Sequence, residues 1–164
     1  MCGALPKGAA HLYKTAMASE AVHEQHRVVP VEFGHFYFGD WPSNPHYAIP
    51  VDNPGLDAVC TEAGIAFFSQ CDEGESALVS LYFFDARPED ADLGGATRGE
   101  LEISGQQVTT ATTDMLPIGP FAPPFTGRAE VRIWRSDGPA SGEVQAAEEW
   151  RVYLWPARGH GERH

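Results

Sequence analysis

Residues 77–84, Ala77-Leu78-Val79-Ser80-Leu81-Tyr82-Phe83-Phe84, decide the fold class of this chain. The stretch is apolar on both faces, and β-branched and aromatic residues favour a strand over a helix. A strand with two apolar faces is typical of the middle of a sheet. The acidic turn Asp72-Glu73-Gly74-Glu75 comes directly before it.

Further strands are predicted on both sides of this central one, with turn signals between them. Residues 28–38 are predicted as one strand that places Val29, Val31, Phe33 and Tyr37 on one face. The other predicted strands are 58–62, 64–71, 100–103, 108–112, 128–134 and 149–155, and proline-rich loops are expected at 39–55 and 117–127. Together they predict an all-β fold, an antiparallel, jelly-roll-like β-sandwich of about seven to eight strands. No long amphipathic helix supports an α/β fold.

A length of 164 residues fits one domain. We expect a mobile or short helical arm over residues 1–26, a sandwich domain over 27–156 and a polar tail over 157–164. In the last strand, Trp150 shares a face with Val152 and Leu154 and is predicted to lie in the core.

The formal net charge is −12, and the ten acidic and two basic residues between Glu62 and Glu102 give that stretch a net charge of −8. Such a charge opposes nucleic-acid binding and favours encounter with a basic partner. No apolar run approaches the ~18 residues of a membrane span, and no secretory signal is recognised. Three cysteines without framework spacing, Cys2, Cys60 and Cys71, fit a reducing compartment, so a cytoplasmic location is predicted.

The acidic loops are the first candidate partner-binding residues. We expect strand-end loops at one end of the sandwich to gather several of the acids of this stretch, and the candidate residues are Asp72, Glu73, Glu75, Asp85, Glu89, Asp90 and Asp92. A second candidate is the pair Tyr153 and Trp155 beside Arg151, a composition typical of interface hot spots if the rings are exposed. General solvation of the acids, and a loop or second sheet over the rings, remain the alternatives.

Six segments carry a resemblance to known proteins: residues 31–38, 64–67, 78–85, 99–104, 127–134 and the closing 149–156. Their order resembles a group of small actinobacterial β-sandwich proteins and, more distantly, the competence protein J family, which inhibits a DNA-entry nuclease. The resemblance covers about residues 27–156 and implies a compact β-sandwich that binds a protein. It supplies no catalytic residue.

Metal and catalytic motifs are weak. His23 and His26 lie three residues apart near Glu20 and Glu24, but no second pair at zinc-site spacing exists. No Gly-x-Ser-x-Gly motif is found. We therefore predict no metal, no cofactor and no catalytic residue, and an enzymatic role is disfavoured without being decided.

The leading hypothesis is a non-catalytic protein-binding module, an inhibitor or immunity protein for a basic effector such as a nuclease or toxin. The alternative is a small-molecule enzyme or binder with a β-barrel mouth lined by His35, His46 and Tyr47. A subunit that forms a homodimer or larger oligomer through its aromatic face is a third hypothesis.

Overall fold

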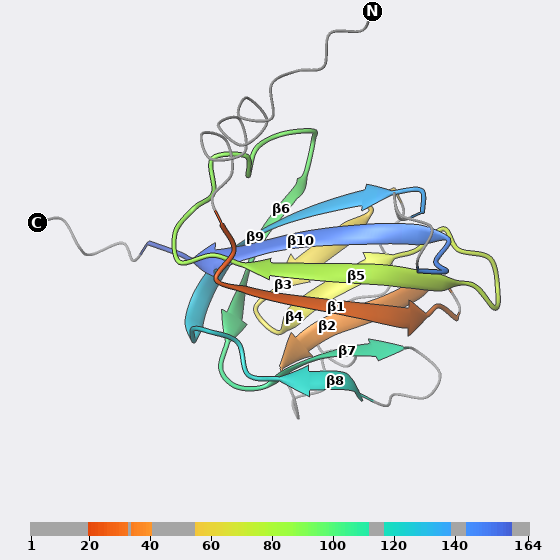
Figure 1. Ribbon diagram of the computed structural model, residues 1–164, viewed down its shortest axis with the longest axis horizontal. Coiled ribbons are helices and arrows are strands. Elements are labelled where there is room, and N and C mark those ends of the chain that lie inside the picture. The colour runs from red at the N-terminus through yellow and green to blue at the C-terminus, as the bar shows by residue number, and fades with distance from the viewer. Residues whose placement is uncertain (1–19, 33, 41–54, 112–116, 139–143, 159–164) are drawn as a thin grey trace, which may run out of the picture.

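The protein folds into two five-stranded sheets that face each other (Figure 1). The structure, a computed structural model, describes residues 20–32, 34–40, 55–111, 117–138 and 144–158. Sheet A has the order β1 (His23–Pro30), β5 (Ser76–Phe83), β10 (Glu148–Pro156), β9 (Gly127–Ser136), β6 (Thr97–Ile103). Sheet B has the order β3 (Ala58–Thr61), β4 (Gly64–Phe68), β2 (His35–Asp40), β7 (Gln107–Ala111), β8 (Pro117–Phe121). The described residues include no helix that could span a membrane.

The all-β sandwich prediction is confirmed, and the described residues alone contain ten strands where about seven to eight were expected. The prediction that residues 77–84 form a central strand is also confirmed, because β5 lies between β1 and β10. The pairing between β5 and β10 is parallel, whereas the other neighbouring strands pair antiparallel. The sandwich is therefore mostly antiparallel, with one parallel pair in the middle of sheet A.

The core lies between the sheets and is built around one indole ring. Trp150 of β10 has no exposed surface, as the alternation of that strand predicts. Its ring centroid lies 5.1 Å from that of Phe67 and 6.2 Å from that of Phe36, both on sheet B. Phe36 and Phe67 stack on each other at 4.6 Å. Because each aromatic side chain buries a large apolar area, these three rings account for much of the attraction between the sheets.

Beside this core, one carboxylate is buried inside the sandwich. Glu148 is 1% exposed. It accepts hydrogen bonds from the Trp150 indole N–H at 2.7 Å, the Arg135 Nε at 2.9 Å and the Gln70 backbone N–H at 3.2 Å, and its side chain also contacts that of Ser69. Burial alone raises the pKa of the Glu148 carboxyl, but the donors around it outweigh burial and hold that pKa below its usual range.

The prediction of one strand over 28–38 is wrong. The chain turns at Gly34, whose φ of 74° lies in the left-handed region that favours glycine, and passes from sheet A to sheet B. Val29 therefore pairs in sheet A with β5, whereas Tyr37 pairs in sheet B with β4. Tyr37 faces away from the core, while Phe36 and Phe38 face into it. Phe33 is outside the described residues.

Two predicted boundaries also change. β1 begins at His23, four residues before the expected start of the domain at Arg27. The predicted loop over 117–127 begins with a strand, β8, at the edge of sheet B. Prolines are tolerated on an edge strand because a missing N–H leaves no central hydrogen bond unmade. The last predicted strand, 149–155, is found as β10 and is one residue longer at each end.

We expect Glu148→Gln to lower the free energy of unfolding by about 3 kcal/mol, because it removes the buried carboxylate that pairs with Arg135 and leaves that arginine only the exposed Asp137. Urea denaturation at pH 7 measures this loss. Glu149→Gln is the matched control, since Glu149 lies on the other face of β10 and forms no ion pair with any described residue. Equal stability of the two variants would contradict this role for the buried carboxylate.

The same network predicts a pH dependence of stability. A carboxyl whose pKa is lowered in the folded state stabilises the protein fully at a pH above its unfolded-state pKa of about 4.3. This stabilisation is lost as the pH falls through the folded-state pKa. The stability difference between wild type and Glu148→Gln should therefore be constant from pH 7 to about 5 and shrink below about pH 4. A difference that grows on acidification would refute this sign.

Candidate partner-binding surface

The turn between β4 and β5 presents a cluster of acids at one end of the sandwich. The Glu75 backbone N–H donates to the Asp72 carbonyl at 3.1 Å, and the Asp72 N–H donates to the Glu75 carboxylate at 2.8 Å. Gly74 adopts a φ of 88°, which such a tight turn requires. These bonds confirm the predicted turn, whose acidic residues Asp72, Glu73 and Glu75 are exposed.

Neighbouring segments add two further acids to this end. Asp57 lies just before β3, and Asp137 just after β9. We call the exposed residues Asp57, Asp72, Glu73, Glu75 and Asp137 the acidic end. The one described arginine at this end is Arg135, and its side chain is 15% exposed and paired with Glu148 and Asp137. The exposed charge here is therefore almost purely negative.

The other predicted acidic loop is not at this end. Asp72 to Glu75 precede β5, whereas Asp85 to Asp92 follow it, so the two groups lie at opposite ends of an eight-residue strand (Figure 1). At about 3.3 Å per residue, that separation is about 23 Å. The two predicted docking loops, 72–75 and 85–92, therefore do not share one end of the sandwich, because β5 runs the length of the sandwich between them.

Two acids of the second loop are tied to the protein itself. Asp92 forms ion pairs with Arg87, with Arg98 at 3.2 Å and with Arg132 at 3.5 Å. The Tyr153 hydroxyl donates to Asp90 at 3.1 Å. Asp92 and Asp90 thus fasten the loop over the outer face of sheet A, while Asp85 and Glu89 stay exposed. Spacing along the sequence gives no sign of these contacts, since they join the loop to strands formed later in the chain.

Trp155 is a candidate partner contact only on condition that its ring is exposed, and that condition is not met, because the ring is covered. Its side chain is 2% exposed and packs with Phe84 and Ala91, which the loop and its approach from β5 place over it. The Arg132 guanidinium lies 5.1 Å from the Trp155 ring centroid on the same side. Burial removes Trp155 as a direct contact for a partner. Tyr153 is half-buried and keeps part of its ring accessible.

Tyr153 belongs to a row of rings on the outer face of sheet A. Its centroid lies 4.7 Å from Trp134 of β9 and 5.6 Å from Tyr82 of β5, and Tyr82 lies 5.7 Å from His26 of β1. We call these four residues the aromatic row. Edge-to-face contacts of this kind fix the rings in place. Burial and the neighbouring Asp90 charge raise the pKa of Tyr153 to about 12, so its hydroxyl stays protonated.

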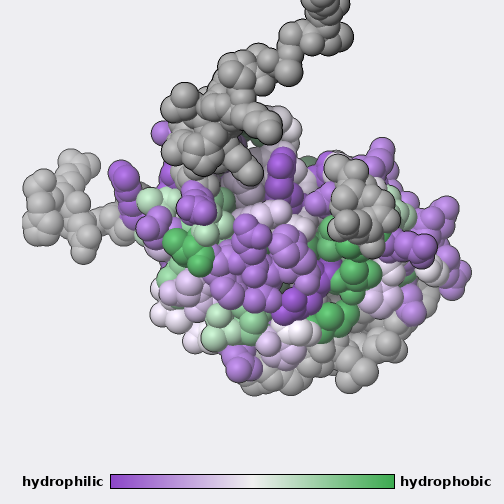
Figure 2. Space-filling view, in the orientation of Figure 1, coloured by the Kyte–Doolittle hydropathy of each residue, from purple (hydrophilic) through white to green (hydrophobic). Residues whose placement is uncertain are grey.

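Hydrophilic side chains surround the aromatic row. Figure 2 shows them gathered over the middle of the face formed by β1, β5 and β10. His26 bonds to Ser80 through Nδ1 at 2.8 Å and to Glu24 through Nε2 at 3.3 Å. This Glu–His–Ser order resembles that of nucleophilic sites, but Ser80 is 2% exposed in mid-strand, which closes the hydroxyl to a substrate. We interpret the chain of bonds as part of the surface and not as a catalytic group.

His23 and His26 lie on a strand and not on a helix, so they point to opposite faces of sheet A. His23 packs at 5.8 Å from Phe121, whereas His26 faces outward. Within the described ranges, no group of three or more His, Cys, Asp or Glu side chains has the arrangement of a metal site.

The small-molecule alternative has little support in the described part of the chain. The two sheets form a sandwich and not a closed barrel, and His35 lies at the start of β2 beside Tyr37, with ring centroids 5.5 Å apart. His46 and Tyr47 are outside the described residues. Cys60 and Cys71 are free thiols. Burial raises the pKa of Cys60 to about 12, which makes it a poor nucleophile.

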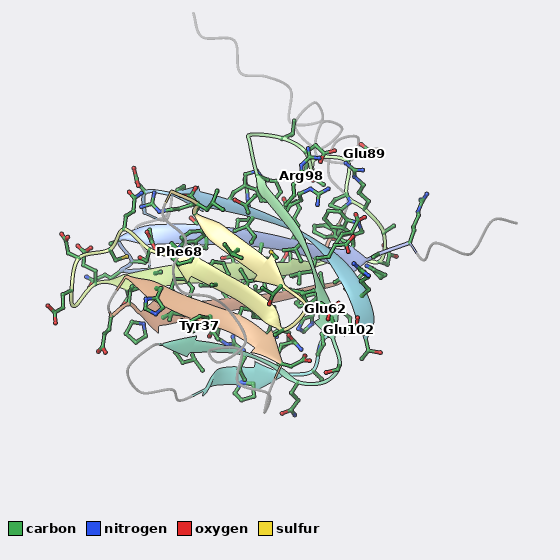
Figure 3. The ribbon with its side chains drawn as sticks, turned by 180° about the vertical axis from the view of Figure 1, so that it is seen from behind. Tyr37, Glu62, Phe68, Glu89, Arg98 and Glu102 are labelled. Carbon is green, nitrogen blue, oxygen red and sulfur yellow. The ribbon has the colours of Figure 1, made fainter. Side chains whose placement is uncertain are left out.

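A small hollow lies at the end of the sandwich away from the acidic end. It is lined by Glu62, Glu100, Glu102 and Arg128, together with Leu101. The backbone N–H of Glu102 donates to the Glu62 carbonyl at 3.0 Å, and Figure 3 shows these two residues side by side where the β3–β4 turn meets β6. Arg128 pairs with Glu100, so the acids here are partly neutralised.

No family model matches the chain, and a comparison with curated proteins finds no match. Two solved structures are similar in fold. ComJ from Bacillus subtilis, described as an inhibitor of the DNA degrading activity of NucA, matches at 10% identity and a TM-score of 0.50, over 86% of this chain and 99% of that chain. The product of crocagin biosynthetic gene J matches at 16% identity and a TM-score of 0.52, over 83% of this chain and 98% of that chain. The likeness to ComJ confirms the predicted resemblance at the level of the fold, and that to actinobacterial proteins stays a prediction.

We expect Asp92→Asn to loosen residues 85–95, because three arginines then face each other without their shared carboxylate. The free energy of unfolding should fall by ~1 kcal/mol, as for a networked surface ion pair. Backbone amides of the loop should exchange hydrogen faster, and acrylamide should quench tryptophan fluorescence more strongly. Glu89→Gln, which removes an exposed charge from the same loop, is the control and should change none of these. Unchanged exchange in Asp92→Asn would show that Asp92 does not fasten the loop.

Proposed function

We propose that this protein is a non-catalytic inhibitor that binds a basic protein, of nuclease or related effector type, through the acidic end. The observation that carries the proposal is the charge of that end. Five exposed acids gather there, and its one described arginine is already paired. The proposal includes a cytoplasmic location, as the use of cysteine predicts.

The clustered charge of the acidic end would speed association with a basic partner. Exposed charge pairs each add little affinity, but a clustered field raises the rate at which an oppositely charged partner arrives. A nuclease carries a positive surface because it must bind phosphates. An acidic end that occupies such a surface would exclude DNA by competition, with no catalytic group needed.

The fold is a second, weaker support. ComJ is described as an inhibitor of a nuclease's DNA degrading activity, and this chain shares its architecture over most of both lengths. Identity of 10% carries no residue-level correspondence, so the acidic end is argued from this chain alone. Relative to the sequence-based hypothesis, the proposed docking surface keeps Asp72, Glu73 and Glu75 and drops Asp85, Glu89, Asp90, Asp92 and Trp155.

The partner is first identified by affinity capture from the source organism, with a tagged wild-type chain and a neutralised variant as parallel baits. We expect the double variant Asp72→Asn, Glu73→Gln to slow association of the purified partner by about three- to tenfold at low salt, because the steering field weakens. The difference should vanish near 0.5 M salt, where the Debye length falls to about 4 Å. Biolayer interferometry across a salt series measures both effects.

The matched control is Asp85→Asn, Glu102→Gln, which removes the same charge from the opposite end of the molecule. Its association rate should stay close to that of wild type. A DNA-degradation assay with the purified partner tests inhibition directly. If the two double variants slowed association equally, the acidic end would serve only general solvation. If the activity of the partner were unchanged in the complex, the inhibitor role would be ruled out.

A further inference from the structure

Arg151 lies at the centre of the aromatic row with its charge exposed. Its guanidinium carbon lies 5.0 Å from the Trp134 ring centroid and 5.9 Å from that of Tyr153. It forms no ion pair with any described residue. By contrast, each of the three arginines of β9 has a carboxylate: Arg128 with Glu100, Arg132 with Asp92 and Arg135 with Glu148. In a chain with 23 acidic residues, an arginine held on rings and left without a carboxylate is notable.

The rings make Arg151 a prepared binding group. Stacking on an indole holds the planar guanidinium in place while its N–H donors stay available, so little side-chain entropy is lost when an anion binds. Arginine, tyrosine and tryptophan are also the residues that most often dominate interface energies. Trp134 is itself fixed, because its indole N–H donates to the Leu93 carbonyl at 2.6 Å. The site is therefore rigid before any partner arrives.

This site is continuous with the acidic end. Glu149 lies two residues before Arg151 on the same face of β10, about 7 Å away along the strand and toward that end. Val28 of β1 is 44% exposed on this face and pairs with Leu78, which in turn pairs with Glu149. A partner that covers the acidic end and extends across sheet A would therefore meet Arg151.

A uniformly basic partner would be repelled at this point. A cation facing Arg151 at close range costs free energy, whereas a carboxylate forms a paired, charge-assisted hydrogen bond. We propose that Arg151, on its platform of Trp134 and Tyr153, binds an aspartate or glutamate that lies within the otherwise basic docking surface of the partner. The inference rests on the proposed function. It makes Arg151 the residue that selects this partner from other basic proteins, because a mismatch there is penalised.

The surface is tested by site-specific photo-crosslinking in extract of the source organism. p-Benzoylphenylalanine replaces Val28, beside the aromatic row, or Glu73, at the acidic end, with Gln106 as an exposed control position. Adducts to the same protein from positions 28 and 73, but not from 106, are the expected result. Adducts from 73 alone would overturn this inference and leave the proposed function standing. No specific adduct from 28 or 73 would overturn both, and an adduct from 28 to a second copy of the chain would replace the partner by a homodimer.

The carboxylate is tested with the crosslinked partner after purification. We expect Arg151→Ala to raise the dissociation rate at least tenfold and to leave the salt dependence of association nearly unchanged. Arg158→Ala is the matched control, since Arg158 is also exposed and without an ion pair among the described residues, and it should have no effect. Binding of the partner by the Arg151→Glu variant should be restored when the partner's acidic residue nearest the position 28 adduct is replaced by a basic residue. The proposal would be overturned if the Arg151→Ala variant dissociated from the partner at the wild-type rate. It would also be overturned if no such charge reversal restored binding.

Discussion

The contact of Trp150 with Phe36 and Phe67 is the constraint on which the rest of the molecule depends. These rings join sheet A to sheet B, and the Trp150 indole N–H also donates to Glu148. The orientation of one side chain thereby fixes both the apolar centre and the buried ion pair with Arg135. Since the inward face of β10 is committed to the core, its outward residues, Glu149, Arg151 and Tyr153, are set at defined places on the surface.

The surface that results is divided by charge. Arginines gather where they hold the loop over sheet A, and most find their carboxylates there. Within the described part of the chain, the acids of the β4–β5 turn form no ion pair, because the arginine at that end is turned inward by Glu148. A buried network in the sandwich thus leaves the acidic end strongly negative.

Sequence reasoning succeeded where the residue pattern of a strand reflects which of its faces are buried. The apolar run of β5 and the alternation of β6, β9 and β10 predict their strands and their buried faces, because period-two patterning reflects local burial. It failed where the cause is distant in sequence. The turn at Gly34 divides one apolar run between two sheets, and β8 is a strand only because β7 pairs with it. Nothing local to Trp155 predicts the loop that covers it, and the contact between Arg151 and Trp134 requires the pairing of β9 with β10.

The position of β10 has a consequence for how the chain is made. Its residues, 148–156, form the middle of sheet A, between β5 and β9, although they come later in the sequence than both neighbours. Until those residues leave the ribosome, β5 and β9 each present an open edge, and such edges pair readily with other chains. Contacts so distant in sequence also fold slowly. The nascent polypeptide therefore cannot close sheet A until residues 148–156 emerge, and it is most vulnerable to aggregation just before that point.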